Sequence, residues 1–75
     1  MGKIKELMFD VAEEVIANYL DVASLDTMDP ETKEDAIYGV LEEYISDIED
    51  ADIVRAMFIR ENMDGMISFI MEMIR

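Results

Sequence analysis

The chain has 75 residues, of which 19 are acidic and six basic, and its formal net charge at neutral pH is −13. It contains neither cysteine nor histidine. This excludes disulfides, zinc or haem sites built from those ligands, and Ser-His-Asp or Cys-His catalysis. With 52% hydrophobic residues the chain is too apolar for an acidic disordered tail, so residues 1–75 are predicted to fold as one small domain.

The first predicted helix covers residues 3–23. Its apolar residues recur at alternating spacings of three and one over about five turns, which is typical of a helix with one face in a core. The acids between them lie off this stripe and are expected to face solvent. The stripe consists of Ile4, Leu7, Met8, Val11, Ala12, Val15, Ile16, Tyr19, Leu20 and Ala23.

The second predicted helix runs from Pro30 to about Ser46, after a connection at residues 24–29. Asp29 is the predicted cap and Pro30 the first helical residue, positions that both residue types favour. Gly39 inside this helix costs about 1 kcal/mol relative to alanine. We therefore expect it to permit a close helix crossing, for instance against Ala12 or Ala17.

The next break is expected at residues 47–51, where Asp47 or Asp50 can cap a third helix. Two arginines on that helix are expected to neutralise neighbouring acids such as Asp52 or Glu61. Asn62 to Gly65 reads as a turn, after which Asp64 is predicted to cap a last helix that ends at Arg75. The third helix is predicted to carry Ile53, Val54, Arg55, Met57, Phe58 and Arg60.

The last helix is apolar nearly all round. Such a helix lies either at the centre of a core or in an interface shared with another chain. Full burial is hard to arrange in a chain of 75 residues, so a homodimer through this helix is the favoured interpretation and a tightly packed monomer the alternative. The predicted interface residues are Met66, Phe69, Ile70 and Met73.

Together these patterns predict an all-α protein: a small four-helix domain, packed as a compact bundle that dimerisation would complete. Its most acidic stretch runs from Asp26 to Asp52 and has eleven carboxylates and one base, Lys33. The candidate partner-binding acids on this stretch are Glu31, Glu34, Asp35, Glu42, Glu43, Asp47, Glu49, Asp50 and Asp52.

No catalytic or metal site is predicted. Acid–base catalysis needs a carboxylate pair with a shifted pKa in a pocket, and the sequence distinguishes no pair among the acids. An EF-hand loop counted from Asp47 would place Ala51 at its fifth position and Asp52 at its sixth, where an acid and a glycine are required. We therefore expect neither an enzyme nor a cofactor.

Ser24-Leu25-Asp26-Thr27 resembles the Asp-Ser-Leu-Asp stretch of acyl carrier proteins, in which the serine carries a phosphopantetheine arm and opens the second helix. Ala23 stands here where that family has its aspartate, and Asp29-Pro30 is predicted to start the second helix five residues after Ser24. This lesser alternative covers four residues.

Asp35-Ala36-Ile37, followed by an acidic amphipathic turn, and Ala51-Asp52-Ile53 with Met57 one turn later are similar to the central part of small acidic phage proteins of the Ocr antirestriction type. Those proteins are helical dimers that mimic the charge of bent B-DNA and block restriction enzymes, and DNA-mimicking anti-CRISPR proteins share the composition. This chain is shorter than Ocr and ends in apolar residues instead of an acidic tail.

The resemblance implies a phage-type inhibitor that blocks the DNA-binding site of a restriction or CRISPR effector. A charge of −13 repels nucleic acid and anionic lipid. The expected partner is therefore a basic nucleic-acid-binding protein, with no direct contact to nucleic acid or membrane. An acidic helical interaction module without mimicry is the alternative. No secretory signal or spanning segment is recognised, and we expect a cytoplasmic protein, in the host cytoplasm if phage-encoded.

Overall fold

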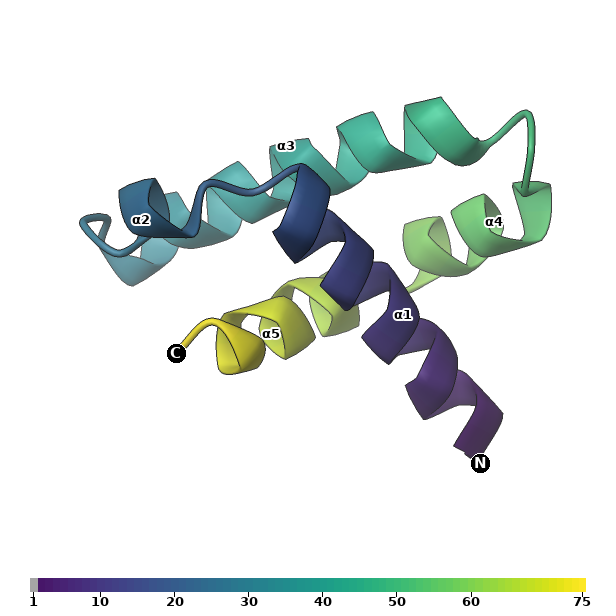
Figure 1. Ribbon diagram of the computed structural model, residues 1–75, viewed down its shortest axis with the longest axis horizontal. Coiled ribbons are helices and arrows are strands. Elements are labelled where there is room, and N and C mark those ends of the chain that lie inside the picture. The colour runs from purple at the N-terminus through teal and green to yellow at the C-terminus, as the bar shows by residue number, and fades with distance from the viewer. Residues whose placement is uncertain (1) are drawn as a thin grey trace.

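A computed structural model describes residues 2–75, with side chains from residue 5 onward. This part of the chain forms five helices and no strand (Figure 1). The all-α prediction is confirmed, although the helices number five and not four. They are α1 (Gly2–Asn18), α2 (Val22–Leu25), α3 (Pro30–Ile48), α4 (Ile53–Glu61) and α5 (Met63–Met73).

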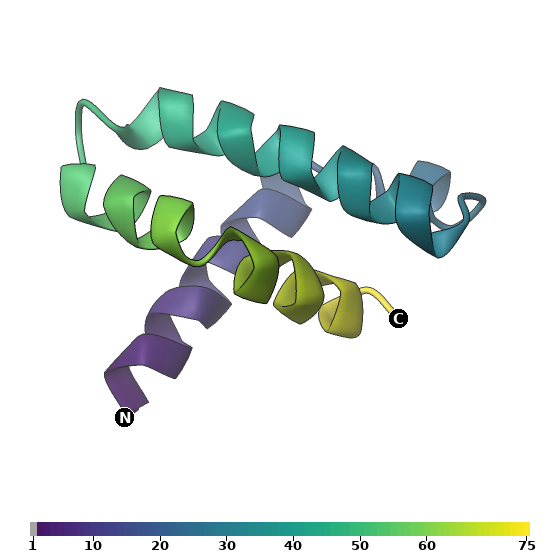
Figure 2. The ribbon, with the colours of Figure 1, turned by 180° about the vertical axis from the view of Figure 1, so that it is seen from behind.

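The helices pack in two layers (Figures 1 and 2). In one layer, α4 and α5 follow one another along the length of α3 and run antiparallel to it. In the other, α1 crosses these helices obliquely and packs against α5 and α3. The Cα radius of gyration is 11.8 Å, against about 11 Å for a compact domain of this length.

The core lies between the two layers and takes apolar residues from all five helices. The predicted stripe of α1 supplies three fully buried residues, and its first member, Ile4, lies outside the described side chains. Burial of these side chains is the main favourable term that holds the helices together. The buried residues are Val11, Ala12, Val15, Leu25, Ile37, Leu41, Tyr44, Ile45, Ala56, Ile59, Met66, Ile67 and Ile70.

The first predicted helix was too long, because the structure ends α1 at Asn18. The apolar spacing continues through Tyr19 and Leu20, but Asp21 then starts a new turn by accepting a hydrogen bond from the Ser24 amide. Periodicity does not record this local competition, in which an aspartate side chain satisfies free backbone amides. The short helix α2 results.

α3 begins where the sequence predicted. Asp29 accepts hydrogen bonds from the amide and the hydroxyl of Thr32, and Pro30 is the first helical residue. The helix ends at Ile48, slightly later than the predicted Ser46, since the Glu49 amide still donates to the Ile45 carbonyl.

The predicted caps of the last two helices were wrong. Asp47 lies inside α3, and Asp52 caps α4, because the chain turns at residues 49–51 and brings its carboxylate to the Arg55 amide at 3.0 Å. Asp64 lies within the first turn of α5, and Asn62 occupies the cap position without a side-chain cap bond. Asn62 instead donates to the Phe58 carbonyl at 2.8 Å. α4 and α5 therefore join through one residue.

Gly39 is not at a helix crossing. It lies on the exposed face of α3, and a Cβ atom there would meet nothing within 4 Å. Of the two proposed neighbours, Ala12 is buried in the core and Ala17 is exposed on α1. The prediction of a close approach at Gly39 was wrong because the glycine points away from the core.

α5 is apolar nearly all round because α1, α3 and α4 all pack against it. Met66 and Ile70 are fully buried within the chain and leave no surface for a partner. Phe69 is half-buried and Met73 is 38% exposed. The predicted dimer interface is therefore reduced to Phe69 and Met73.

Candidate protein-interaction surface

The nine acids predicted to bind a partner lie on α3 and in the turn that follows it. Eight of them are exposed and Glu49 is half-buried. The sequence thus identified side chains that reach solvent, as expected for residues off the apolar stripe.

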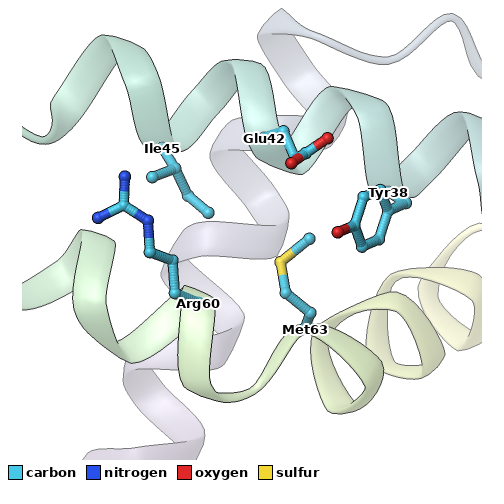
Figure 3. Close-up of a pocket in the computed structure, with 5 residues that line it drawn as sticks. All are labelled: Tyr38, Glu42, Ile45, Arg60 and Met63. Carbon is cyan, nitrogen blue, oxygen red and sulfur yellow. The ribbon is translucent and has the colours of Figure 1, made fainter.

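These acids do not form a single ridge. Residues 31, 35, 42 and 49 repeat at spacings of four and seven and so share one edge of α3, which we call the first acidic row. Glu43 and Asp47 lie four residues apart on the opposite edge and form the second acidic row. The exposed residues Thr32, Gly39 and Ser46 separate the two rows. Figure 3 shows Glu42 of the first row projecting from the side of α3 that faces α4.

Three of the nine acids are already engaged inside the molecule. Asp47 accepts a hydrogen bond from the Tyr19 hydroxyl at 2.6 Å, and Glu49 forms an ion pair with Arg60. Asp52 caps α4 and lies 3.6 Å from Nε of Arg55. These contacts tie α3 and its turn to neighbouring elements, so the three carboxylates have structural roles.

The bond to Asp47 has a clear effect on Tyr19. Donation to this carboxylate favours the neutral phenol and raises the pKa of Tyr19 to about 12, with smaller contributions from burial and from the nearby charges. The Tyr19 ring also meets the Tyr44 ring edge-to-face, with centroids 5.4 Å apart. These contacts fix the segment that leaves α1 against the last turns of α3.

A second network joins α1, α3 and α4. The Tyr44 hydroxyl donates to Oε2 of Glu14 at 2.8 Å, and Nη1 of Arg55 lies 3.2 Å from both of those oxygens. Burial of the Tyr44 side chain raises its pKa, and the bond to Tyr44 raises the pKa of Arg55. Local sequence patterns do not reveal this network, because its members lie 11 to 41 residues apart.

Six of the nine acids form no hydrogen bond or ion pair with any side chain that the structure describes: Glu31, Glu34, Asp35, Glu42, Glu43 and Asp50. A further row of this kind lies on α1. Glu6, Asp10 and Glu13 are exposed at spacings of four and three. Sequence reasoning placed them off the stripe without assigning them a role, although the same spacing rule identifies them.

A shallow groove of about 270 Å³ lies where α3 faces the junction of α4 and α5 (Figure 3). Glu42 is its only carboxylate, and the Arg60 side chain extends across it towards Ile45. The remaining lining residues are Tyr38 and Met63. Its side chains offer no pair of acids for proton transfer.

α4 carries apolar side chains on its outer face. Ile53 is 55% exposed, Val54 71% and Met57 51%. We call these three residues the α4 apolar patch. Asp50 and Asp52 precede the patch, and Glu61 follows Met57 by one turn. The spacing of these apolar residues in the sequence predicts a helix, but it does not separate core residues from surface residues.

The part of the chain that the structure describes contains no cluster of acids arranged to hold a metal ion. None of its helices combines the length and the apolar character that crossing a bilayer requires. Ser24 lies within α2, where its hydroxyl donates to Asp21 at 2.9 Å. It therefore does not open the long helix α3, as the serine of a carrier protein would.

Comparison with models of protein families, with curated proteins and with solved structures gives no match to this chain.

Proposed function

We propose that this protein is an inhibitor that mimics the charge of nucleic acid and occupies the DNA-binding site of a host defence protein of the restriction or CRISPR type. The observation that supports the proposal best is the arrangement of carboxylates on α3. Two rows of acids line the opposite edges of the exposed face of α3, and most of them have no internal partner.

The spacing of these acids suits a site built for phosphates. Carboxylates four residues apart on a helix, here Glu31 with Asp35 and Glu43 with Asp47, are about 6 Å apart, similar to neighbouring phosphates on one strand. The seven-residue steps of the first acidic row correspond to about 10 Å along the helix. The two rows are separated by at most the diameter of the helix, about 10–12 Å with side chains. The major groove of B-DNA is about 12 Å wide. A protein that binds phosphates on both sides of a groove can thus meet carboxylates on both sides of α3.

The basic residues of the chain cause little repulsion of a basic partner that approaches α3. Arg55, Arg60 and Arg75 each form an ion pair with an acid of the chain itself. Carboxylates outnumber basic residues by 19 to six. A basic cleft that approaches α3 would consequently meet a mainly negative field, in which Lys33 is the one basic residue of the helix. Such a field speeds encounter and favours the release of counterions.

The proposal is tested first in cells. Bacterial strains that each carry one restriction or CRISPR system are challenged with a susceptible phage, with and without expression of the chain. We expect the chain to restore phage plating in at least one strain. The protein that it inhibits is then purified, and the chain is titrated into its complex with DNA. Mimicry requires that DNA and the chain displace one another from the target. The affinity of the chain for the target should also fall as salt is added. Simultaneous binding of DNA and the chain would refute it.

A charge-matched pair of variants separates the contribution of the two α3 rows to inhibition from the contribution of the overall net charge. The test variant carries Asp35→Lys, Glu42→Lys and Glu43→Lys, three acids without internal bonds. Asp47 is left unchanged because it holds Tyr19. The control carries Glu6→Lys, Asp10→Lys and Glu13→Lys on α1. Both variants gain the same charge, and only the first should lose inhibition. Equal loss in both would show that net charge alone, and not the α3 surface, is responsible.

A second function is favoured by a different observation. A pure mimic of phosphate charge has no need of the exposed apolar side chains Ile53, Val54 and Met57. They support an acidic module that binds a protein partner without mimicry. In that case DNA would not displace the partner, which is the outcome that distinguishes the two functions.

A further inference from the structure

The α4 apolar patch occupies a position that a small water-soluble helix normally gives to polar residues. Ala56 and Ile59 face the core from α4 and are fully buried. Val54 and Met57 lie on the opposite side of the helix, with Ile53 beside them, and more than half of each side chain is exposed. Contiguous exposed apolar residues with a polar rim are typical of interaction sites.

The charges around the patch restrict what can cover it. Asp50 and Asp52 lie at its N-terminal end and Glu61 at its C-terminal end. The two arginines of α4 are paired within the chain, Arg55 with Glu14 and Asp52, and Arg60 with Glu49. Asp50 and Glu61 form no ion pair with any side chain that the structure describes. A partner must therefore present apolar side chains to Val54 and Met57 and positive charge beyond them, since unlike charges at a rim favour association.

A second copy of this chain fits the patch poorly. Two-fold pairing places a surface against itself, so the same acids would face one another. Three side chains also fall far short of the roughly 800 Å² per partner of a standard protein interface. An amphipathic helix needs less, because a few anchors at spacings of three and four residues make the contact.

We propose that the α4 apolar patch binds a basic amphipathic helix of a partner protein. The apolar face of that helix covers Val54 and Met57, and its lysines or arginines lie against Asp50 and Glu61, whereas Asp52 is engaged as the cap of α4. The inference does not depend on mimicry by α3. In Figure 1, α4 lies at the end of the molecule opposite α2, which provides a distant control site.

The test uses the whole chain and a synthetic peptide of leucine and lysine at helical spacing. A peptide of equal charge, with serine in place of leucine, is the control. With ¹³C-methyl methionine, we expect the leucine peptide to shift the Met57 signal and leave the buried Met66 signal unchanged. In about 1 M salt, where the Debye length is about 3 Å, the leucine peptide should stay bound and the serine peptide should not.

Val54→Ser should weaken binding of the leucine peptide at least tenfold. Val22→Ser is the matched control, because Val22 is also exposed and lies on α2. Equal affinity of wild type and Val54→Ser, or equal binding of both peptides, would overturn the proposal. It would also be overturned by a concentration-dependent dimer that Val54→Ser abolishes. The outcome of the DNA titration on α3 bears on none of these results.

Discussion

The Tyr19 hydroxyl donates to Oδ2 of Asp47 at 2.6 Å and so joins the residue that follows α1 to the last turns of α3. The two residues are 28 positions apart, and the bond holds the two layers together at the end of α1. The bond also makes the stability of the protein depend on pH in the alkaline range. Because the folded pKa of Tyr19 is raised to about 12, this contribution is complete below the ordinary tyrosine pKa of about 10 and is lost as pH rises through 12.

Replacement of Asp47 by asparagine should lower the pKa of Tyr19 towards 10, because an amide oxygen still accepts the bond but carries no charge. The ultraviolet absorbance of tyrosinate follows this change, and Tyr19→Phe identifies which step belongs to Tyr19. Asp50→Asn is the control, since it removes the same charge from the following turn. An unchanged Tyr19 titration in Asp47→Asn would contradict the assigned bond.

The hydroxyl of Tyr44 should matter more for stability than that of Tyr38. Tyr44 is buried, and its hydroxyl links Glu14 and Arg55, so Tyr44→Phe should lower the free energy of unfolding by about 1 kcal/mol. Tyr38 is 46% exposed, and Tyr38→Phe should change stability by less than about 0.5 kcal/mol. Urea denaturation measures both. Equal effects would show that the Tyr44 hydroxyl contributes no more to stability than an exposed one, since the ion pair of Arg55 with Glu14 remains in Tyr44→Phe.

Gly39→Ala should stabilise the protein. The residue lies in the middle of α3, and a Cβ atom there has open space around it. Alanine gains about 0.5–1 kcal/mol over glycine in a helix interior, largely by restricting the unfolded chain. Thermal unfolding is the measurement, and circular dichroism should show unchanged helix content. A lower melting temperature would mean that another helix does approach this face.

Much of the fold could be predicted because helical periodicity is local. The stripe of α1, the Asp29-Pro30 start of α3 and the outward placement of the acids all follow from residues a few positions apart. The errors arose where tertiary contacts or competing caps determine helix ends and side-chain packing. The network of Glu14, Tyr44 and Arg55 depends on three helices meeting, which no local spacing records.

The candidate surface also combines features that local spacing predicts with features that depend on tertiary contacts. Spacing alone predicts which acids are exposed, but it did not show that Asp47, Glu49 and Asp52 are engaged within the molecule. Nor did it show that the acids form two rows, since that depends on which side of α3 faces the core. The α4 apolar patch escaped prediction because a short helix with apolar residues on several sides does not reveal which of them are covered.

Whether α5 packs only within one chain or also forms a dimer can be decided by measuring the stability of the protein at several concentrations. An apolar helix suggested a dimer, yet Met66 and Ile70 are buried within one chain. We expect Ile70→Val to cost about 0.5–1.5 kcal/mol, a substantial part of a total on the order of 5 kcal/mol for a domain of this size. Met73→Ala should cost less, because 38% of that residue is exposed. Both effects should be independent of protein concentration, as should the melting temperature of the wild type.

A dimer through Phe69 and Met73 would instead raise the melting temperature with concentration, and Phe69→Glu with Met73→Glu would remove that dependence. Sedimentation of wild type and variant across the same concentrations provides the second measurement.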